Sequence, residues 1–136
     1  MGSGPALTLP ADQRARLERL GLEFLAEMLT RSLTRHPDDF ERLAELATTL
    51  TRLGRLAEGL AADERLVRLA PEDPTVHYNL ACSLALLGRA EDAVEALEHA
   101  VELGYDDVAH LRTDADLAAL REVPRFRALL ERLARS

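Results

Sequence analysis

Two residues of this sequence could support nucleophilic catalysis, namely Cys82 and His77. A cysteine nucleophile needs a base within hydrogen-bond reach of its thiol. On a single helix, five residues of separation place the two side chains more than one turn apart, so we do not expect them to meet. The sequence also lacks a glycine-rich phosphate loop and a nucleophile elbow. We therefore predict no catalytic residue and a protein that is not an enzyme.

A metal site would have to come from histidines and carboxylates. The four histidines are His36, His77, His99 and His110, and none belongs to a paired motif such as HExxH. Asp106, His110 and Asp114 recur at intervals of four, so they could share a helical face and hold an ion. A calcium loop would need further ligands at fixed offsets and a glycine, which are missing. We therefore predict no metal and no cofactor, and interpret these residues as helix caps and solvated charges.

Composition restricts the class of partner. The chain has 136 residues and a formal net charge of −7, and all of its basic residues are arginine. Binding to a phosphate backbone needs a basic face, so we expect no nucleic-acid partner. No apolar run reaches the roughly 18 residues of a membrane span, so we expect no membrane partner. With 47% hydrophobic residues, the chain can form one domain with a real core.

Several features predict where the protein is found. A single cysteine, Cys82, excludes an internal disulfide and is expected to be a small buried residue. Residues 1–10 lack the charged and apolar regions of a signal peptide, and we expect them to be a disordered tail. We therefore expect a cytoplasmic protein. The richness in leucine, alanine and arginine suggests a GC-rich bacterial genome.

The stretch from Pro74 to Gly104 predicts two helices that would position any functional residues. Leu80, Leu84 and Leu87 share one face of the first helix, beside the small Ala81. The second helix, Ala90 to Glu102, has its own apolar face, formed by Ala93, Leu97, Ala100 and Val101. Because the link at Gly88 is short, the two helices are expected to pack antiparallel as a hairpin.

A shift of about 34 residues reproduces this hairpin. Leu46-Ala47 then corresponds to Leu80-Ala81, and Leu53-Gly54-Arg55 to Leu87-Gly88-Arg89. This period, with Pro71 closing the unit, resembles the tetratricopeptide repeat (TPR) and gives repeats at residues 40–73 and 74–107. The sequence departs from the family pattern at an early and a late position. Leu43 and His77 replace an early aromatic residue, and a late bulky residue is Leu97 in one copy but Asp63 in the other.

Helical segments flank the two repeats. Residues 11–37 are expected to form an N-terminal helix, either continuous or broken at Gly21, which ends at His36-Pro37. Its apolar stripe consists of Leu17, Leu20, Phe24, Leu25, Met28, Leu29 and Leu33. Residues 108–136 are similar to the non-repeat tail that closes many bacterial TPR proteins. A tail of this kind would cover the apolar face of the last hairpin with Phe126, Leu129, Leu130 and Leu133.

The predicted fold is therefore a single all-α TPR-like domain over residues 1–136. Its antiparallel hairpins would stack as a short right-handed solenoid, with an N-terminal helix and a C-terminal helical cap. Asp63 would then face the next hairpin, where a buried carboxylate needs a donor. His77 or Tyr78 are the expected donors, and a hydrated junction is the alternative.

The resemblance implies a non-catalytic adaptor or scaffold that presents a concave groove to a peptide or helix of a protein partner. The expected partner-binding residues are Glu41, Thr48, Arg52, Tyr78, Asn79, Cys82 and Leu86. Asn79 matches an asparagine of the carboxylate clamp that some family members use, but Ala44 and Thr48 replace its lysine and second asparagine, so the clamp is absent. The alternative is a self-assembling unit, such as a homodimer, whose groove is filled by its own ends or by another copy.

Overall fold

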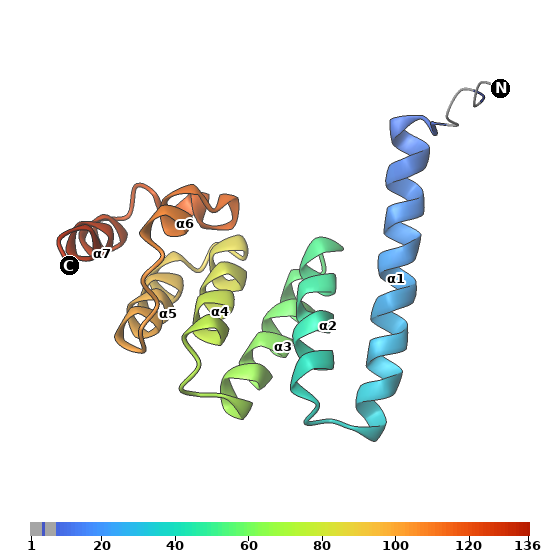
Figure 1. Cartoon of the computed structure of the whole chain (residues 1–136), viewed down its shortest axis with the longest axis horizontal. Helices are drawn as coiled ribbons and strands as arrows, with labels where there is room; N and C mark the ends of the chain where they lie inside the picture. Colours follow the sequence, from blue (N-terminus) through green and yellow to red (C-terminus); the bar gives the residue numbers. More distant parts are fainter. Residues whose placement is uncertain (1–3, 5–7) are drawn as a thin grey trace.

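The computed structural model describes residue 4 and residues 8–136, and this part of the chain is all-helical without a strand. The helices are α1 (Ala11–Arg35), α2 (Phe40–Arg52), α3 (Leu56–Leu69), α4 (Pro74–Leu86), α5 (Ala90–Glu102), α6 (Val108–Thr113), the 3-10 helix η1 (Ala115–Leu120) and α7 (Pro124–Ala134). They follow one another as stacked antiparallel pairs (Figure 1), which confirms the predicted all-α, TPR-like solenoid. The predicted tail over residues 1–10 falls mostly outside the described residues.

Short local signals form the two central hairpins, α2 with α3 and α4 with α5. Asp39 and Asp73 cap α2 and α4, because their carboxylates accept hydrogen bonds from the amides of Arg42 and Thr75. The turn after α4 passes through Gly88, whose φ of 79° is in the left-handed region that glycine adopts without strain. Each hairpin therefore begins at an acidic cap and reverses at a glycine.

A glycine also lies at the contact between α2 and α3. Gly59 is buried, and a Cβ built on it would lie 2.8 Å from Thr51 Oγ1 on α2. Real Cβ atoms essentially never make so short a contact, so a side chain here would force the Thr51 hydroxyl, which bonds to the carbonyl of Ala47, to move. In the second hairpin the corresponding residue is Ala93, which is fully buried.

The core lies between the helices as two apolar clusters. One contains Leu29, Leu43, Leu50 and Leu66 and joins α1 to the first hairpin, and the other joins the second hairpin to the cap. Leu84 of α4 is buried and Leu80 is only partly buried, whereas Leu87, just after α4, is 36% exposed. The prediction that Leu87 shares the helical face of Leu80 and Leu84 is therefore wrong, because Leu87 lies beyond the end of α4, in the turn.

Helix α1 is continuous through Gly21, and its C-terminal half packs against α2 (Figure 1). Leu29 and Leu33 are buried there. Leu17, Leu20, Phe24 and Met28 are instead more than half exposed. The predicted single stripe is therefore divided between a buried face and an exposed face.

The last three helices fold back over the end of the second hairpin (Figure 1). Leu117 and Leu120 of η1 are fully buried, and Phe126 of α7 is only 1% exposed. Leu129 is buried beside Phe126, and Leu130 and Leu133 pack at the margin of the same cluster. The segment therefore covers the apolar face that the second hairpin would otherwise expose. Among the described residues, no helix is both long and apolar enough to span a membrane.

Candidate partner-binding groove

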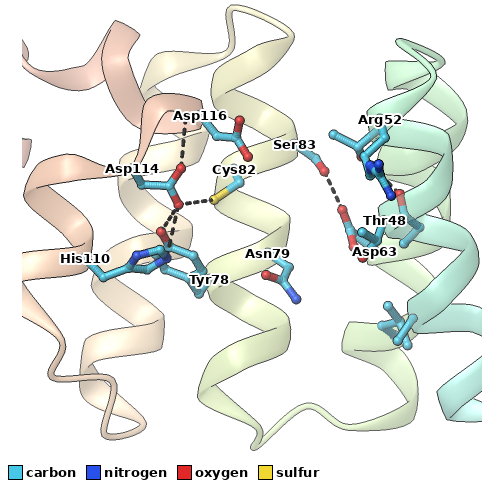
Figure 2. Close-up of a pocket in the computed structure, with 14 residues that line it drawn as sticks. Thr48, Arg52, Asp63, Tyr78, Asn79, Cys82, Ser83, His110, Asp114 and Asp116 are labelled. Atoms are coloured by element: carbon cyan, nitrogen blue, oxygen red, sulfur yellow. Dashed lines mark hydrogen bonds and ion pairs between the residues drawn. The ribbon is translucent and has the colours of Figure 1, made fainter. Parts of the chain in front are cut away.

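A pocket of about 270 Å³ opens between α2, α4 and the cap (Figure 2). Five of the seven expected partner-binding residues line it, namely Thr48, Arg52, Tyr78, Asn79 and Cys82. Thr48, Arg52 and Asn79 are exposed, whereas Tyr78 and Cys82 are buried. The other two expected residues, Glu41 and Leu86, are not among the residues that line the pocket. The solenoid therefore brings one set of side chains from α2 next to another from α4.

The cap side of the pocket is built around the carboxylate of Asp114. One of its oxygens accepts a hydrogen bond from the amide of Asp116 at 2.9 Å, which caps η1. The other oxygen accepts a hydrogen bond from the Tyr78 hydroxyl and lies 3.8 Å from Cys82 Sγ and 3.4 Å from His110 Nε2. Figure 2 shows these side chains converging on the carboxylate. A single residue of the cap thus contacts two residues of α4.

Tyr78 is held from two sides. Its ring stacks on that of Tyr105, with centroids 4.6 Å apart and planes 7° from parallel, and only 5% of the residue is exposed. Burial raises the pKa of Tyr78 and of the Cys82 thiol above their ordinary values. Both groups therefore remain protonated at neutral pH and act as hydrogen-bond donors.

On the opposite wall, a buried hydrogen bond joins the two hairpins. Ser83 donates its hydroxyl to the carboxylate of Asp63, which is only 4% exposed. Burial raises the pKa of Asp63 to about 6, although the bond from Ser83 acts in the opposite direction. The bond across the hairpins is thus present, but the expected donors were wrong. His77 Nε2 lies 2.7 Å from the carbonyl of Pro71, and Tyr78 bonds to Asp114.

The geometry does not support the catalytic pair that the sequence raised. The ring of His77 packs edge-on against that of His99, with centroids 4.4 Å apart, while Cys82 points toward Asp114. A thiol whose pKa is raised by burial is also a poor nucleophile, because the thiolate is the reactive form.

The structure brings together a different set of candidate metal ligands from the set that the sequence suggested. One ligand atom each from Cys82, Asp114 and Asp116 lies within 4.8 Å of the others, whereas Asp106 lies outside this group. A bound metal would need the Cys82 thiolate, which burial disfavours. Two effects raise the pKa of Asp116, namely its desolvation, which is the larger, and the charge of the nearby Asp114. The arrangement therefore serves as a hydrogen-bonded junction between α4 and the cap.

The pocket is acidic overall. Its lining includes the carboxylates of Asp63, Asp114 and Asp116, and only one guanidinium, that of Arg52. Sequence reasoning placed Arg52 in the groove but did not place Asp114 or Asp116 there. Both lie in the predicted capping tail over residues 108–136, but no local signal shows that the tail folds back as far as Tyr78, which lies 36 residues before Asp114.

No family model matches the chain. Over 86 residues it is 34% identical to a chloroplastic protein of Arabidopsis thaliana, a match that covers 61% of this chain and 26% of that protein. Over 82 residues it is 35% identical to the TPR repeat-containing thioredoxin TTL4 of the same plant, covering 60% of this chain and 12% of that protein. The matched segments are thus a minor part of both relatives. Both are plant proteins, so a bacterial source stays a prediction.

The stacked helical hairpins and the similarity to a protein named for its TPR repeats agree with each other. Together they define a tetratricopeptide-like helical protein. Helical solenoids of this class present extended concave surfaces to other proteins. In general terms, the fold and the comparison therefore indicate a module for protein interaction.

Proposed function

We propose that this protein is a non-catalytic adaptor that binds a segment of another protein in the groove between α2, α4 and the cap. The observation that carries the proposal is the open acidic pocket, in which the side chains of Thr48, Arg52 and Asn79 remain accessible beside buried polar groups. Accessible polar side chains around a concave site can bond to a peptide backbone without any rearrangement of the core.

The charges of the pocket favour a partner segment with a basic side chain. Asp63 stands on α3, Asp114 and Asp116 stand at the start of η1, and Arg52 stands on α2. A lysine or arginine inserted between these carboxylates would be attracted to several of them at once. Each carboxylate is already partly desolvated by its surroundings, so an incoming cation would gain more there than at an open surface.

Each expected residue has a distinct role in this proposal. Asn79 and Thr48 would bond to the backbone of the bound segment from opposite sides of the groove. Arg52 would repel a basic residue placed at the wrong end and so fix the direction of the segment. Tyr78 and Cys82 would form the floor, while Glu41 and Leu86 would contact only a segment that extends beyond the pocket.

In the alternative, the chain's own ends would fill the groove, but they cover only one of its sides. Tyr105, in the turn after α5, covers the ring of Tyr78, and Asp114 of the cap bonds to its hydroxyl. Asn79 and Thr48 stay uncovered by any described segment. We therefore favour binding of a separate partner over complete self-occupation of the groove.

A displayed library of random twelve-residue peptides tests the proposal directly. Selection against the full chain should enrich peptides with a central lysine or arginine. The enriched peptides should bind Asn79→Arg at least about tenfold more weakly, because the new side chain fills the entrance and repels the basic residue. Ala61→Arg, at an exposed position of α3 outside the pocket, is the matched control and should bind as the unchanged protein does.

Replacing the charge of the peptide completes the experiment. Exchange of its basic residue for glutamine should weaken binding to the unchanged protein, and Asp116→Asn should reduce that difference. Enriched peptides that bind Asn79→Arg as well as Ala61→Arg would show that the groove is not the binding site. Enrichment of acidic peptides would contradict the charge preference.

A further inference from the structure

The exposed apolar face of α1 is a second surface without a partner within the described chain. Leu17, Leu20, Phe24 and Met28 are 55%, 61%, 65% and 51% exposed. Their spacing of three and four residues places them in one row along the helix. The buried residues Ala26, Leu29 and Leu33 belong to the other face of α1, which packs against α2. The row therefore points away from the rest of the molecule.

The position of α1 leaves this row accessible. Helix α1 is the outermost element at its end of the solenoid, and its N-terminal half extends beyond α2 (Figure 1). Contiguous exposed apolar patches of several hundred Å² on a soluble protein usually mark an interaction site. The acidic groove is built from α2, α3, α4 and the cap, so the α1 surface is separate from it.

We propose that the α1 row is a homodimer interface, in which α1 of a second copy packs antiparallel against it about a twofold axis. The proposal does not depend on what the groove binds. In a twofold interface the same patch serves both copies, so the row and its flanking charges must complement themselves. The flanks of the row meet this requirement.

Arg16 and Glu27 lie on the same side of the row, near its two ends. In an antiparallel twofold pair, the register that places Leu20 against Phe24 of the second copy also brings Arg16 within one residue of Glu27 of the second copy. The symmetry repeats this pair at the other end of the interface. A parallel twofold pair would instead place these charged flanks on opposite sides of the interface, where Arg16 and Glu27 could not pair.

The intrachain pairs of α1 do not prevent this contact. Glu27 is 2.7 Å from Arg31, and both side chains are more than half exposed, so this pair adds little by itself. A carboxylate has two oxygens and can accept from both Arg31 and Arg16 of the second copy. Charges of both signs would therefore border the apolar row in the dimer.

The size of the row sets the expected strength. Four large side chains in each copy, with the stems of the flanking arginines, would bury an area near the roughly 1,200 Å² lower limit of specific interfaces. We therefore expect a dimer that dissociates on dilution in the micromolar range rather than a permanent one. The association should be visible in the concentration dependence of the solution mass.

Sedimentation equilibrium of the full chain, from low micromolar to near-millimolar concentration, tests the proposal. The unchanged protein should pass from monomer to dimer. Leu20→Glu should weaken the dimer at least about tenfold, because it places a charge in the centre of the interface. Leu69→Glu is the matched control, since Leu69 is an exposed leucine of α3 (39%), and should leave the dimer unchanged.

Charge exchange tests the antiparallel register. Arg16→Glu and Glu27→Arg should each weaken the dimer, whereas the double variant should restore it, because the unlike pair is formed again. An equimolar mixture of the two single variants should also form a heterodimer. Helical content measured by circular dichroism confirms that each variant is folded.

Several results would overturn the inference. They are a protein that stays monomeric at every concentration, a dimer equally sensitive to Leu20→Glu and Leu69→Glu, and a double exchange that fails to restore association. A monomer whose α1 binds lipid vesicles would assign the row to a membrane surface instead. A dimer that is lost with Asn79→Arg but retained with Leu20→Glu would place the contact at the groove.

Discussion

The two ends of this solenoid solve the same problem differently. At the C-terminal end, the last hairpin is covered by the cap, in which Phe126, Leu117 and Leu120 are almost completely buried. At the N-terminal end, α1 covers the first hairpin with one face but exposes Leu20 and Phe24 on the other. A repeat stack must cover its terminal apolar faces to remain soluble and monomeric. One end is therefore closed by its own chain, and the other is suited to association.

The comparison can be tested most strongly with two phenylalanines. Phe126→Ala should lower the free energy of unfolding by about 3–5 kcal/mol, because it removes a buried ring and leaves a cavity. Phe24→Ala should change it by less than about 0.5 kcal/mol, the usual range for an exposed site. Urea unfolding followed by circular dichroism, at a protein concentration low enough to avoid association, measures both. Similar losses for the two variants would contradict the difference between the ends.

The centre of the stack provides the next largest effect. Leu84→Ala should cost about 2–4 kcal/mol of unfolding free energy, since Leu84 is buried in the cluster that joins α4, α5 and the cap. Leu80 is only partly buried, so Leu80→Ala should cost roughly half as much. The same urea experiment compares them. A loss below about 1 kcal/mol for Leu84→Ala would show that this position is not in the core.

The attachment of the cap to α4 can be weakened without creating a cavity. Tyr78→Phe keeps the ring stacked on Tyr105 but removes the hydroxyl that bonds to Asp114. The expected loss is about 1.5 kcal/mol, near the lower limit for a bond to a charged group, because Asp114 is partly exposed and water can replace the hydroxyl.

Hydrogen exchange would show where the Tyr78→Phe effect is located. Amides of α6 and η1 should exchange faster, while those of α1 and α2 should stay unchanged. Tyr105→Phe, which keeps the stacked ring, is a suitable control. Equal acceleration throughout the chain would mean that the cap does not open separately from the N-terminal end.

The smallest expected effect concerns the junction between the two halves, and it depends on pH. The folded-state pKa of Asp63 is raised from 3.8 to about 6, so the folded protein holds this proton more tightly than the unfolded chain does. The corresponding stability is present below about pH 4 and is lost as the pH rises through about 6. Asp63→Asn keeps an acceptor for Ser83 but does not ionise.

We therefore expect Asp63→Asn to be more stable than the unchanged protein at pH 7.5, on the order of 1 kcal/mol, with the difference shrinking toward pH 4.5. The size is kept small because the pocket admits water near the carboxylate. Urea titrations at several pH values provide the measurement. A difference that does not vary with pH would mean that Asp63 is not titrating as a buried acid.

The sequence by itself determined the helices and their turns. Asp39 and Asp73 as caps, Gly54 and Gly88 in the turns, and Pro37 after the first helix act within a few residues. The repeat then predicted that successive hairpins would stack, because similar apolar faces must pack against one another. Cap residues such as Phe126 could be assigned for the same reason, since an apolar face at the end of a stack requires a cover.

Only the tertiary structure decided which side chains meet across the stack. Asp114 reaches Tyr78 from 36 residues away, and Ser83 rather than His77 or Tyr78 serves Asp63. The spacing of the apolar residues of α1 places them along the helix but does not show which of them a neighbour covers, because periodicity does not record the presence of a neighbour. Contacts of this kind depend on the angles at which helices pack. Those angles are set by all the side chains of an interface together, and no short segment contains that information.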